Sequence, residues 1–311
     1  MVDQQNHTAV INFILLGFQD LHDLNIPFFI LLLMIYIMTI SGNMLIVILV
    51  SISPLLNTPM YFFLCHLSLC DVLFTTNIVP NMLHVILKEG SSVSLAGCLT
   101  QLQIFECCGT AECYILTVMS YDRYLAICNP LRYFSIMGYK LCLGLVLLSW
   151  LLGFIFALVA CVLIARLQFC KPKMIDHFFC DFLPVLELSC SDTLTVKIEA
   201  FIVLPFIVLF PFVFVIVTYV YIFFTILGIS STTGRQKTFS TCSSHLAVVC
   251  VFYGTLICIY LSPSDGHALN INKFISLLYT VVTPLFNPII YSLRNQEIRK
   301  ALNPYLKRCR R

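Results

Sequence analysis

The chain has 311 residues, of which 59% are hydrophobic and 11% are charged. So few charged side chains cannot cover the surface of a soluble domain of this length, and the composition leaves no segment for a soluble catalytic or nucleic-acid-binding domain. The formal net charge is only +3, so the distribution of charge along the chain is more informative than its sum.

Long apolar runs follow one another along the whole chain. The first reads IPFFILLLMIYIMTISGNMLIVILV, from Ile26 to Val50. It is continuous, whereas a membrane-spanning barrel would alternate in segments of about ten residues. Since about 20 apolar residues cross the hydrocarbon core as a helix, we predict an all-α fold, a single domain of seven transmembrane helices. The predicted spans are 27–49, 60–87, 98–127, 141–164, 196–229, 238–261 and 274–293, followed by a short cytoplasmic helix and tail at 294–311.

The basic residues predict the orientation of this bundle. Of the 18 Lys and Arg residues, twelve fall on the side of the C-terminus and six on the opposite side. Cytoplasmic loops carry the excess of basic residues, which places the N-terminus outside and the C-terminus inside. The first residues contain no basic region with a cleavable apolar core, so we expect no cleaved signal peptide. Asn6, in Asn6-His7-Thr8, is then a candidate glycosylation site, although such triplets also occur by chance.

Cysteine usage also fits an outer face in an oxidising space. Most of the 16 cysteines lie inside predicted spans, where they serve as small apolar residues. Four fall on the predicted outer side, namely Cys98, Cys170, Cys180 and Cys190. An even number there indicates two disulfides, and the spacing alone leaves three pairings open.

Three acidic residues lie within predicted spans, at Asp71, Glu106 and Glu112. Acids inside a membrane are costly and are functional candidates by default. Helical spacing places Glu106 on roughly one face with Thr110 and Cys113. An acid there would bind a cationic or hydrogen-bond-donating ligand, or it would bond a neighbouring helix and support the fold.

The stretch MSYDRYLAICNPLRY places an acid and a base side by side at the inner end of the third span. Arg123 can reach the interface or bond Asp122, while Tyr124 anchors the membrane boundary. An interfacial anchor explains the arginine alone. A neighbouring carboxylate adds a restraint that a competing partner can release, which is a two-state element.

This stretch resembles the signature of rhodopsin-like G-protein-coupled receptors, and its longer form resembles the odorant (olfactory) receptor family. Further matching motifs occur in the same order along the chain: GN at Gly42-Asn43, PMYFFLCHLSLCDV at 59–72, TFSTCSSHL at 238–246, FYGT at 252–255 and PLFNPIIYSLRN at 284–295. The resemblance covers nearly all of the sequence.

The resemblance implies a receptor without enzymatic activity. It implies a multi-pass protein of the plasma membrane, in the lipid bilayer of olfactory sensory cilia, with no nucleic-acid partner. A small organic odorant would bind from outside, and a heterotrimeric stimulatory G protein would bind the inner face and raise cAMP.

The same resemblance assigns roles to individual residues. The disulfides implied are Cys98–Cys180 and Cys170–Cys190. The coupling switch comprises Asp122, Arg123, Tyr124, Tyr219 and Tyr291. The ligand pocket comprises Phe105, Glu106, Gly109, Thr110, Val203, Ile207, Tyr253, Leu256, Ile257, Tyr260, Leu277 and Thr280.

Asp71 and Glu112 are placed by the resemblance in an inner polar core with Asn43, Asn287 and Ser120. Two neighbouring carboxylates do not both stay ionised without a cation. A sodium ion with oxygen ligands, or a protonated pair without metal, would satisfy this requirement, and no other cofactor is expected. His245 has no partner at metal-ligand spacing, so a structural or gating role is expected for it.

The sixth span departs from many related receptors outside the odorant group. It has no proline, and Tyr253 takes the expected pivot position. Its inner end offers Arg235 and Lys237 instead of an acid, so Asp122 is expected to be the main restraint on Arg123. Two other functions remain open: a non-olfactory chemoreceptor of the same fold, and a transporter or channel whose ion path Asp71 and Glu112 would line.

Overall fold

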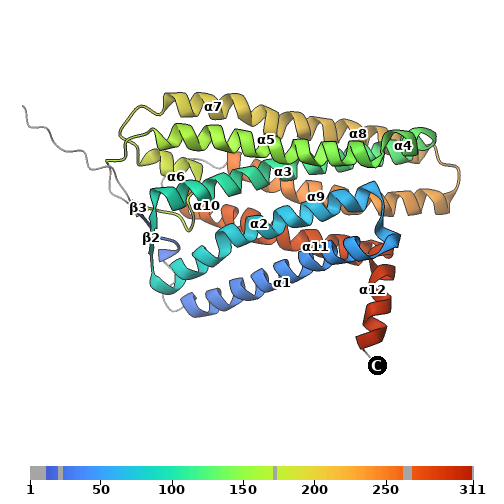
Figure 1. Ribbon diagram of the computed structural model, residues 1–311, viewed down its shortest axis with the longest axis horizontal. Helices are drawn as coiled ribbons and strands as arrows, with labels where there is room; N and C mark the ends of the chain where they lie inside the picture. The colour runs from blue at the N-terminus through green and yellow to red at the C-terminus, as the bar shows by residue number, and fades with distance from the viewer. Residues whose placement is uncertain (1–11, 20–23, 171–173, 262–267, 310–311) are drawn as a thin grey trace, which may run out of the picture.

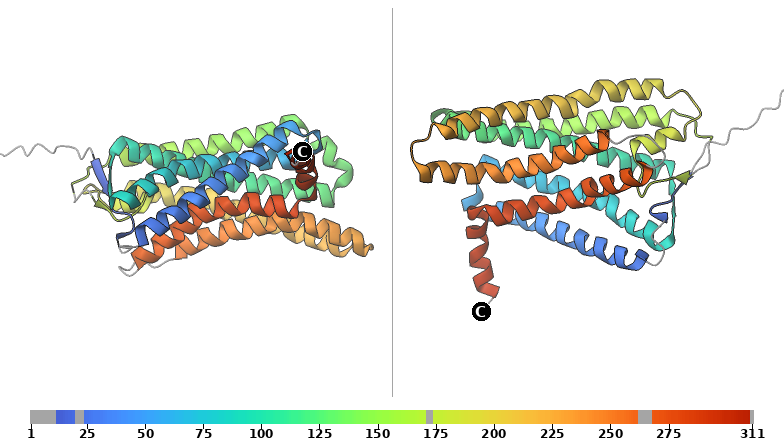
Figure 2. Two further views of the ribbon diagram at one scale, coloured as in Figure 1. Left: turned by 90° about the horizontal axis from the view of Figure 1, so that it is seen from below. Right: turned by 180° about the vertical axis from the view of Figure 1, so that it is seen from behind.

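The computed structural model describes residues 12–19, 24–170, 174–261 and 268–309, and long helices dominate it (Figure 1). The first four long helices are unbroken: α1 (Asn25–Ile52), α2 (Pro59–Lys88), α3 (Leu95–Cys128) and α5 (Tyr139–Ala165). They run side by side along the long axis, and α3 packs against α2, α5 and α8 (Figure 2). Asn6 lies outside the described residues.

The fifth and seventh spans are each interrupted by one π-helical turn. The fifth consists of α7 (Leu194–Leu204), a π turn at Pro205–Leu209, and α8 (Phe210–Leu227). The seventh consists of α10 (Ala268–Leu277), a π turn at Leu278–Val282, and α11 (Thr283–Arg294). Such a turn is a bulge of one extra residue within an α-helix, and it is frequent at functional sites.

The sixth span, α9 (Thr232–Leu261), begins earlier than the predicted boundary at residue 238. Its first turns contain polar residues and extend the helix beyond the apolar run that the sequence marks, so only Gly228 to Ser231 separate α8 from α9. The connection between the predicted spans 196–229 and 238–261 is therefore mostly helical.

Local sequence explains where several helices begin and end. Proline occupies the first turn of α2 and of α4 (Pro130–Ile136), where its missing N–H costs nothing. Ser94 caps α3, because its Oγ accepts a hydrogen bond of 3.1 Å from the N–H of Gly97. The amphipathic helix α12 (Gln296–Cys309) then projects away from the bundle axis at the end predicted to be cytoplasmic, called the inner end below (Figure 1).

Five helical segments are long and apolar enough to cross a membrane, among the residues that the structure describes. They are Asn25–Ile52, Pro59–Lys88, Tyr139–Ala165, Leu194–Leu227 and Lys273–Ser292. The more polar α3 lies between α2, α5 and α8, and α9 packs on α11 and α3. Between α3 and α5 the approach is close, because a Cβ on Gly153 would lie 2.5 Å from the carbonyl oxygen of Cys107.

A small sheet and a short helix cover the outer end of the bundle. Strand β1 (Asn12–Leu15) pairs antiparallel with β2 (Ser91–Ser94) and parallel with β3 (Met174–Ile175). Helix α6 (Phe182–Glu187) follows β3, and Phe13 and Leu15 of β1 are fully buried beneath this cover. The chain segment before the first span is thereby fixed onto the loop that precedes the fifth.

Candidate functional site

The loop before the fifth span is held in place by two disulfides, Cys98–Cys180 and Cys170–Cys190. These are the pairings that the family resemblance implies. Cys180 is also fixed by its backbone N–H, which donates a hydrogen bond of 2.9 Å to Oε1 of Gln101 on α3. The loop therefore lies directly against the outer turns of α3.

Next to the Cys98–Cys180 disulfide, aromatic side chains of this loop pack into the bundle. Phe178 and Phe179, which precede Cys180, are both buried. The ring of Phe179 lies 5.1 Å from that of Phe105 on α3, and Phe105 in turn lies 5.1 Å from Phe74 and 6.0 Å from Tyr279. This aromatic cluster joins α2, α3, the π turn of the seventh span and the outer loop.

An ion pair fixes the same loop to the seventh span and to the N-terminal segment. Nζ of Lys273 lies 2.5 Å from Oδ1 of Asp176 and donates to the carbonyl of Gly17 at 3.1 Å. Burial, together with the Lys273 ammonium, lowers the pKa of the adjacent His177 to about 3, which keeps its imidazole neutral. Burial also raises the pKa of Asp181, although the N–H of Phe182 stabilises its carboxylate at 2.8 Å.

Several predicted ligand-pocket residues line the bundle below this loop. Gly109 leaves room for the hydroxyl of Tyr279, because a Cβ there would lie 2.8 Å from that oxygen. Thr110, Tyr253, Leu256 and Thr280 are buried in the bundle, and Ile207 and Leu277 pack partly buried against its core.

Other predicted pocket residues are placed differently. Ile257 is 44% exposed, whereas Leu256 beside it is 8% exposed, so the two face different surroundings. Val203 is partly exposed near the end of α7, and the side chain of Tyr260 lies outside the described side chains. Contact of any of these residues with a ligand stays a prediction.

Glu106 lies at the outer part of α3, one turn from Thr110. It is partly buried, and its charged neighbours are two further acids, Asp181 in the loop and Glu199 on α7. Three carboxyl groups near one another repel when ionised, so this corner of the bundle favours a cation or a hydrogen-bond donor.

The inner polar core is built around one amide. Nδ2 of Asn287 on α11 donates to both carboxylate oxygens of Asp71, at 3.1 and 3.0 Å, and lies 3.5 Å from Oε1 of Glu112. Asn43 joins α1 to the same helix, because its Nδ2 donates to the carbonyl of Pro284 at 3.1 Å. Ser120 bonds within α3, to the carbonyl of Thr117 at 2.7 Å.

Asp122 and Arg123 form an ion pair at the inner end of α3. Nε of Arg123 donates to Oδ2 of Asp122 at 2.9 Å, and the hydroxyl of Tyr133 on α4 donates to Oδ1 of the same carboxylate at 2.8 Å. Asp122 is fully buried. Burial and the Asp122 carboxylate together raise the pKa of Tyr133, so its hydroxyl remains the donor.

The remaining switch residues surround this pair. The hydroxyl of Tyr219 on α8 lies 2.6 Å from Nδ1 of His245 on α9, which gives His245 a structural partner. The ring of Tyr124 lies 6.0 Å from that of Tyr221, and Tyr291 on α11 is fully buried. Thus α3, α4, α8, α9 and α11 each contribute a polar aromatic or charged side chain to the inner end.

Comparison with known proteins decides the family. A family model described as olfactory receptor matches residues 32–308. The chain belongs to the olfactory receptor family. Olfactory receptor 11A1 of Homo sapiens is 45% identical over 306 residues, which cover 98% of this chain and 96% of that protein. Olfactory receptor 5P76 of Mus musculus is 43% identical over 305 residues, covering 98% and 97%, respectively.

This olfactory receptor is therefore a multi-pass membrane protein and not an enzyme. Two contacts of the receptor were not predicted from its sequence. Tyr133 lies within the quoted motif, eleven residues after Asp122, but nothing in the spacing shows that α4 folds back onto α3. The Lys273–Asp176 pair joins residues 97 positions apart, and neither has a local sequence signal.

Proposed function

We propose that this receptor binds a small organic odorant in the outer half of its bundle and activates a heterotrimeric stimulatory G protein of the olfactory type at its inner end, which raises cAMP. We also place it in the plasma membrane of olfactory sensory cilia. Family membership supports ligand detection. The observation that carries the proposal is the buried Asp122–Arg123–Tyr133 arrangement, which restrains one arginine at the inner end of the central helix.

The outer half suits a small, mostly apolar ligand. Pockets for such ligands are lined by hydrophobic and aromatic side chains with a few polar groups that fix orientation. Phe105 and Tyr253 supply aromatic surface, and Thr110 and Glu106 supply polar groups one turn apart on α3. The disulfide-fixed loop above them limits how large a ligand can enter from outside.

The inner end suits a protein partner. Leu131 is 99% exposed and Phe134 is 87% exposed, on the short helix α4 that also carries Tyr133. Large apolar side chains exposed together at an aqueous surface mark interaction sites. A partner that covers α4 would contact the helix that restrains Asp122, which couples docking at α4 to the state of Arg123.

A sodium ion fits the chemistry of the inner polar core. Asp71 and Glu112 are buried, both lie near one amide of Asn287, and no described Lys or Arg forms an ion pair with either of them. Two buried carboxylates without a basic partner require a shared proton or a cation. Carboxylate oxygens suit a hard cation such as sodium, whose single charge would offset one of the two carboxylates and hold α2 and α3 together, while the amide of Asn287 joins α11 to them.

A panel of volatile compounds, applied to cells that express the full chain with a cAMP reporter, tests the coupling proposal. We expect a concentration-dependent rise in cAMP for a subset of compounds, and no rise in cells that lack the receptor. Ligand-driven ion flux that persists without a G protein, together with no cAMP response, would contradict the proposal and support a channel. Expression of the protein in olfactory epithelium, examined by immunolabelling, tests the proposed location.

A further inference from the structure

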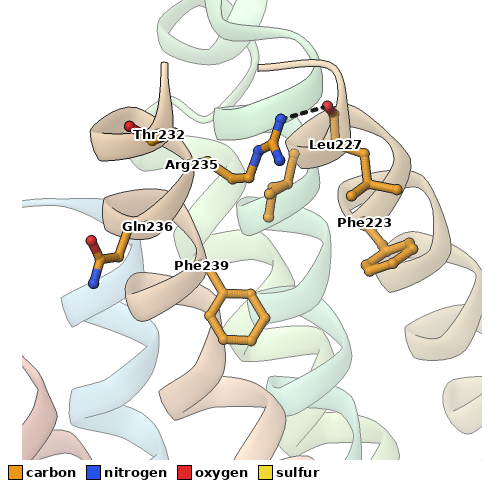
Figure 3. A pocket seen from close by; sticks show the side chains of 7 residues that line it. Phe223, Leu227, Thr232, Arg235, Gln236 and Phe239 are labelled. Carbon is orange, nitrogen blue, oxygen red and sulfur yellow. Dashed lines mark hydrogen bonds between the residues drawn. The ribbon is translucent and has the colours of Figure 1, made fainter. Parts of the chain in front are cut away.

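A groove of about 300 Å³ opens at the inner end of the bundle, between the last turns of α8 and the first turns of α9. Phe223 and Leu227 form its α8 wall, and Phe239 forms the apolar part of its α9 wall (Figure 3). Thr232 and Gln236 stand nearer the end of the helices. The groove lies at the opposite end of the molecule from the predicted ligand residues, so it does not belong to that site.

The groove has an apolar half and a polar half. Phe223, Leu227 and Phe239 are 55%, 49% and 58% exposed, which leaves a wall of uncovered aromatic and aliphatic surface. Thr232, Arg235 and Gln236 are also exposed and supply hydrogen-bond donors at the end nearer the cytoplasm. Ile226 is 6% exposed and closes the floor.

Arg235 is the cation of this groove. Its Nη2 caps the end of α8, donating to the carbonyls of Leu227 at 3.1 Å and Ile229 at 3.0 Å (Figure 3). Its Nη1 and Nε make no bond to any described residue, so their N–H groups remain available as donors. A single charge-assisted hydrogen bond from either group can bind a phosphate oxygen.

The electrostatics favour an anion at this position. The sequence from Phe201 to Leu261, which includes all of α8 and α9, contains no aspartate or glutamate. Its only Lys and Arg residues are Arg235 and Lys237, both at the inner end. Thr232 also begins α9, and a helix N-terminus adds partial positive charge to that of the guanidinium.

The apolar wall continues the membrane-facing surface of α8. Ile216, Val220 and Phe223 are 46%, 48% and 55% exposed and follow one another at helical spacing toward Leu227. An occupant can therefore enter sideways from the bilayer and keep an apolar chain against this stripe. The inner leaflet carries anionic lipids, and the polar half of the groove lies beyond its apolar half, toward the end of the helices.

We propose that this groove binds one anionic phospholipid of the inner leaflet. The phosphate accepts a charge-assisted hydrogen bond from a free N–H of Arg235, at Nε or Nη1. One acyl chain lies against Phe223, Leu227 and Phe239. The bound lipid bridges the inner ends of α8 and α9. A soluble anion lacks the acyl chain, and a zwitterionic phospholipid offers the same phosphate without the net negative charge that favours binding at the guanidinium.

Photocrosslinking tests this proposal with the full chain in nanodiscs of phosphatidylcholine and phosphatidylserine. The probe is phosphatidylserine with a diazirine on one acyl chain, and peptide mapping locates the label. We expect label on Phe223, Leu227 or Phe239 above the level found with a phosphatidylcholine probe of the same chain. Arg235→Gln should lower this label about fivefold, which corresponds to about 1 kcal/mol for one basic residue at an anionic surface.

Arg132→Gln provides the matched control, because Arg132 is an exposed cytoplasmic arginine outside the groove. We expect it to leave the groove label unchanged. Since Arg235 also caps α8, a second variant avoids this structural role: Phe239→Glu adds a negative charge at an exposed wall position. It should abolish the phosphatidylserine label and lower the phosphatidylcholine label much less.

Three results would overturn the proposal. Equal labelling of the groove by both probes would show that any lipid passes along this surface. An equal loss of label in Arg132→Gln and Arg235→Gln would show that the cytoplasmic charge as a whole attracts the probe. If the G protein displaces the probe completely while the phosphatidylcholine probe labels as strongly as phosphatidylserine, the groove is a protein-docking surface instead.

Discussion

The hydroxyl of Tyr133 donates a hydrogen bond of 2.8 Å to Oδ1 of Asp122, while Arg123 bonds the other oxygen of the same carboxylate. Tyr133 and the surrounding helices therefore hold the Asp122 carboxylate in place, and the carboxylate in turn restrains Arg123. Tyr133 is mostly buried, so water does not replace its hydrogen bond without movement of α4.

Removing this hydrogen bond should loosen the restraint on Arg123. Tyr133→Phe keeps the ring and deletes the donor, and a hydrogen bond to a charged group contributes about 1.5–3 kcal/mol. We expect a rise in ligand-independent cAMP, measured against surface expression in the same cells. Tyr139→Phe is the control, because Tyr139 is 71% exposed. Equal basal cAMP in Tyr133→Phe and in the unmodified receptor would show that α4 does not stabilise the resting state.

Arg123 itself is expected to be essential for coupling. Arg123→Ala should abolish the odorant-driven cAMP response while leaving surface display largely intact, because the arginine faces the inner end and pairs only with Asp122 among the ion pairs described. Arg166→Ala, at an exposed position just after α5 at the opposite end of the bundle, serves as the control. Full signalling by well-expressed Arg123→Ala receptors would reduce Arg123 to an interfacial anchor.

The sodium proposal predicts a loss of ion dependence. Asp71→Asn removes one of the two carboxylates near Asn287 and, with it, most of the attraction for a monovalent cation. We expect agonist potency in this variant to become independent of sodium, measured by replacing sodium with a large organic cation at constant ionic strength. Should sodium dependence persist unchanged in Asp71→Asn, the ion does not bind at this pair.

Sequence patterns located the long helices well, because continuous apolar runs report membrane burial directly. For the second span the predicted range is 60–87 and the helix is Pro59–Lys88. The pattern did not predict the inner extension of α9, since its first turns are polar and outside the apolar run. Nor did it predict the outer sheet, whose strands contain two to four residues, too few for a recognisable alternation.

In the candidate site, too, some contacts were predictable from the sequence and others were not. The Asp122–Arg123 pair is local, so the motif was sufficient to predict it, and Asn287 was placed near Asp71 by resemblance. Contacts that depend on a loop folding back over the bundle have no local signal. The Lys273–Asp176 pair belongs to this class.

His177 beside that pair should make the outer loop sensitive to acid. Its pKa is about 3 in the folded receptor, against about 6.5 unfolded, so below pH 6.5 the unfolded chain binds the extra proton. The stability contributed by neutral His177 is fully present above that pH and is lost as pH falls toward 3. We expect a loss of about 2 kcal/mol at about pH 5 relative to neutral pH.

Thermal unfolding of the purified receptor at about pH 7.5 and about pH 5 measures this loss. Other groups titrate over the same range, so the informative quantity is the difference from His177→Phe, which keeps an aromatic ring beside Phe178 and Phe179 but does not bind a proton. The fall in Tm between the two pH values should be smaller in this variant. An identical fall would exclude His177 as the source of acid sensitivity.

Glu106 should determine how the receptor distinguishes charged from neutral ligands. Its carboxylate lies near those of Asp181 and Glu199, an arrangement that a cationic ligand would relieve. A charged hydrogen bond contributes about 1.5–3 kcal/mol, or about one to two decades of affinity. Glu106→Gln preserves the shape and removes the charge, so potency should fall by about 10- to 100-fold for amine odorants and much less for neutral analogues of the same shape.

Concentration–response curves for matched amine and neutral compounds, read by cAMP and corrected for surface expression, separate the possible roles of Glu106. Glu199→Gln is the matched control, since it removes a neighbouring carboxylate from α7 while leaving Glu106 in place. Because charge attraction falls with distance, we expect it to shift amine potency less than Glu106→Gln does. If Glu106→Gln lowers the potency of amine and neutral ligands equally, Glu106 supports the fold and does not contact the ligand. If the potency of both is unchanged, Glu106 lies outside the pocket.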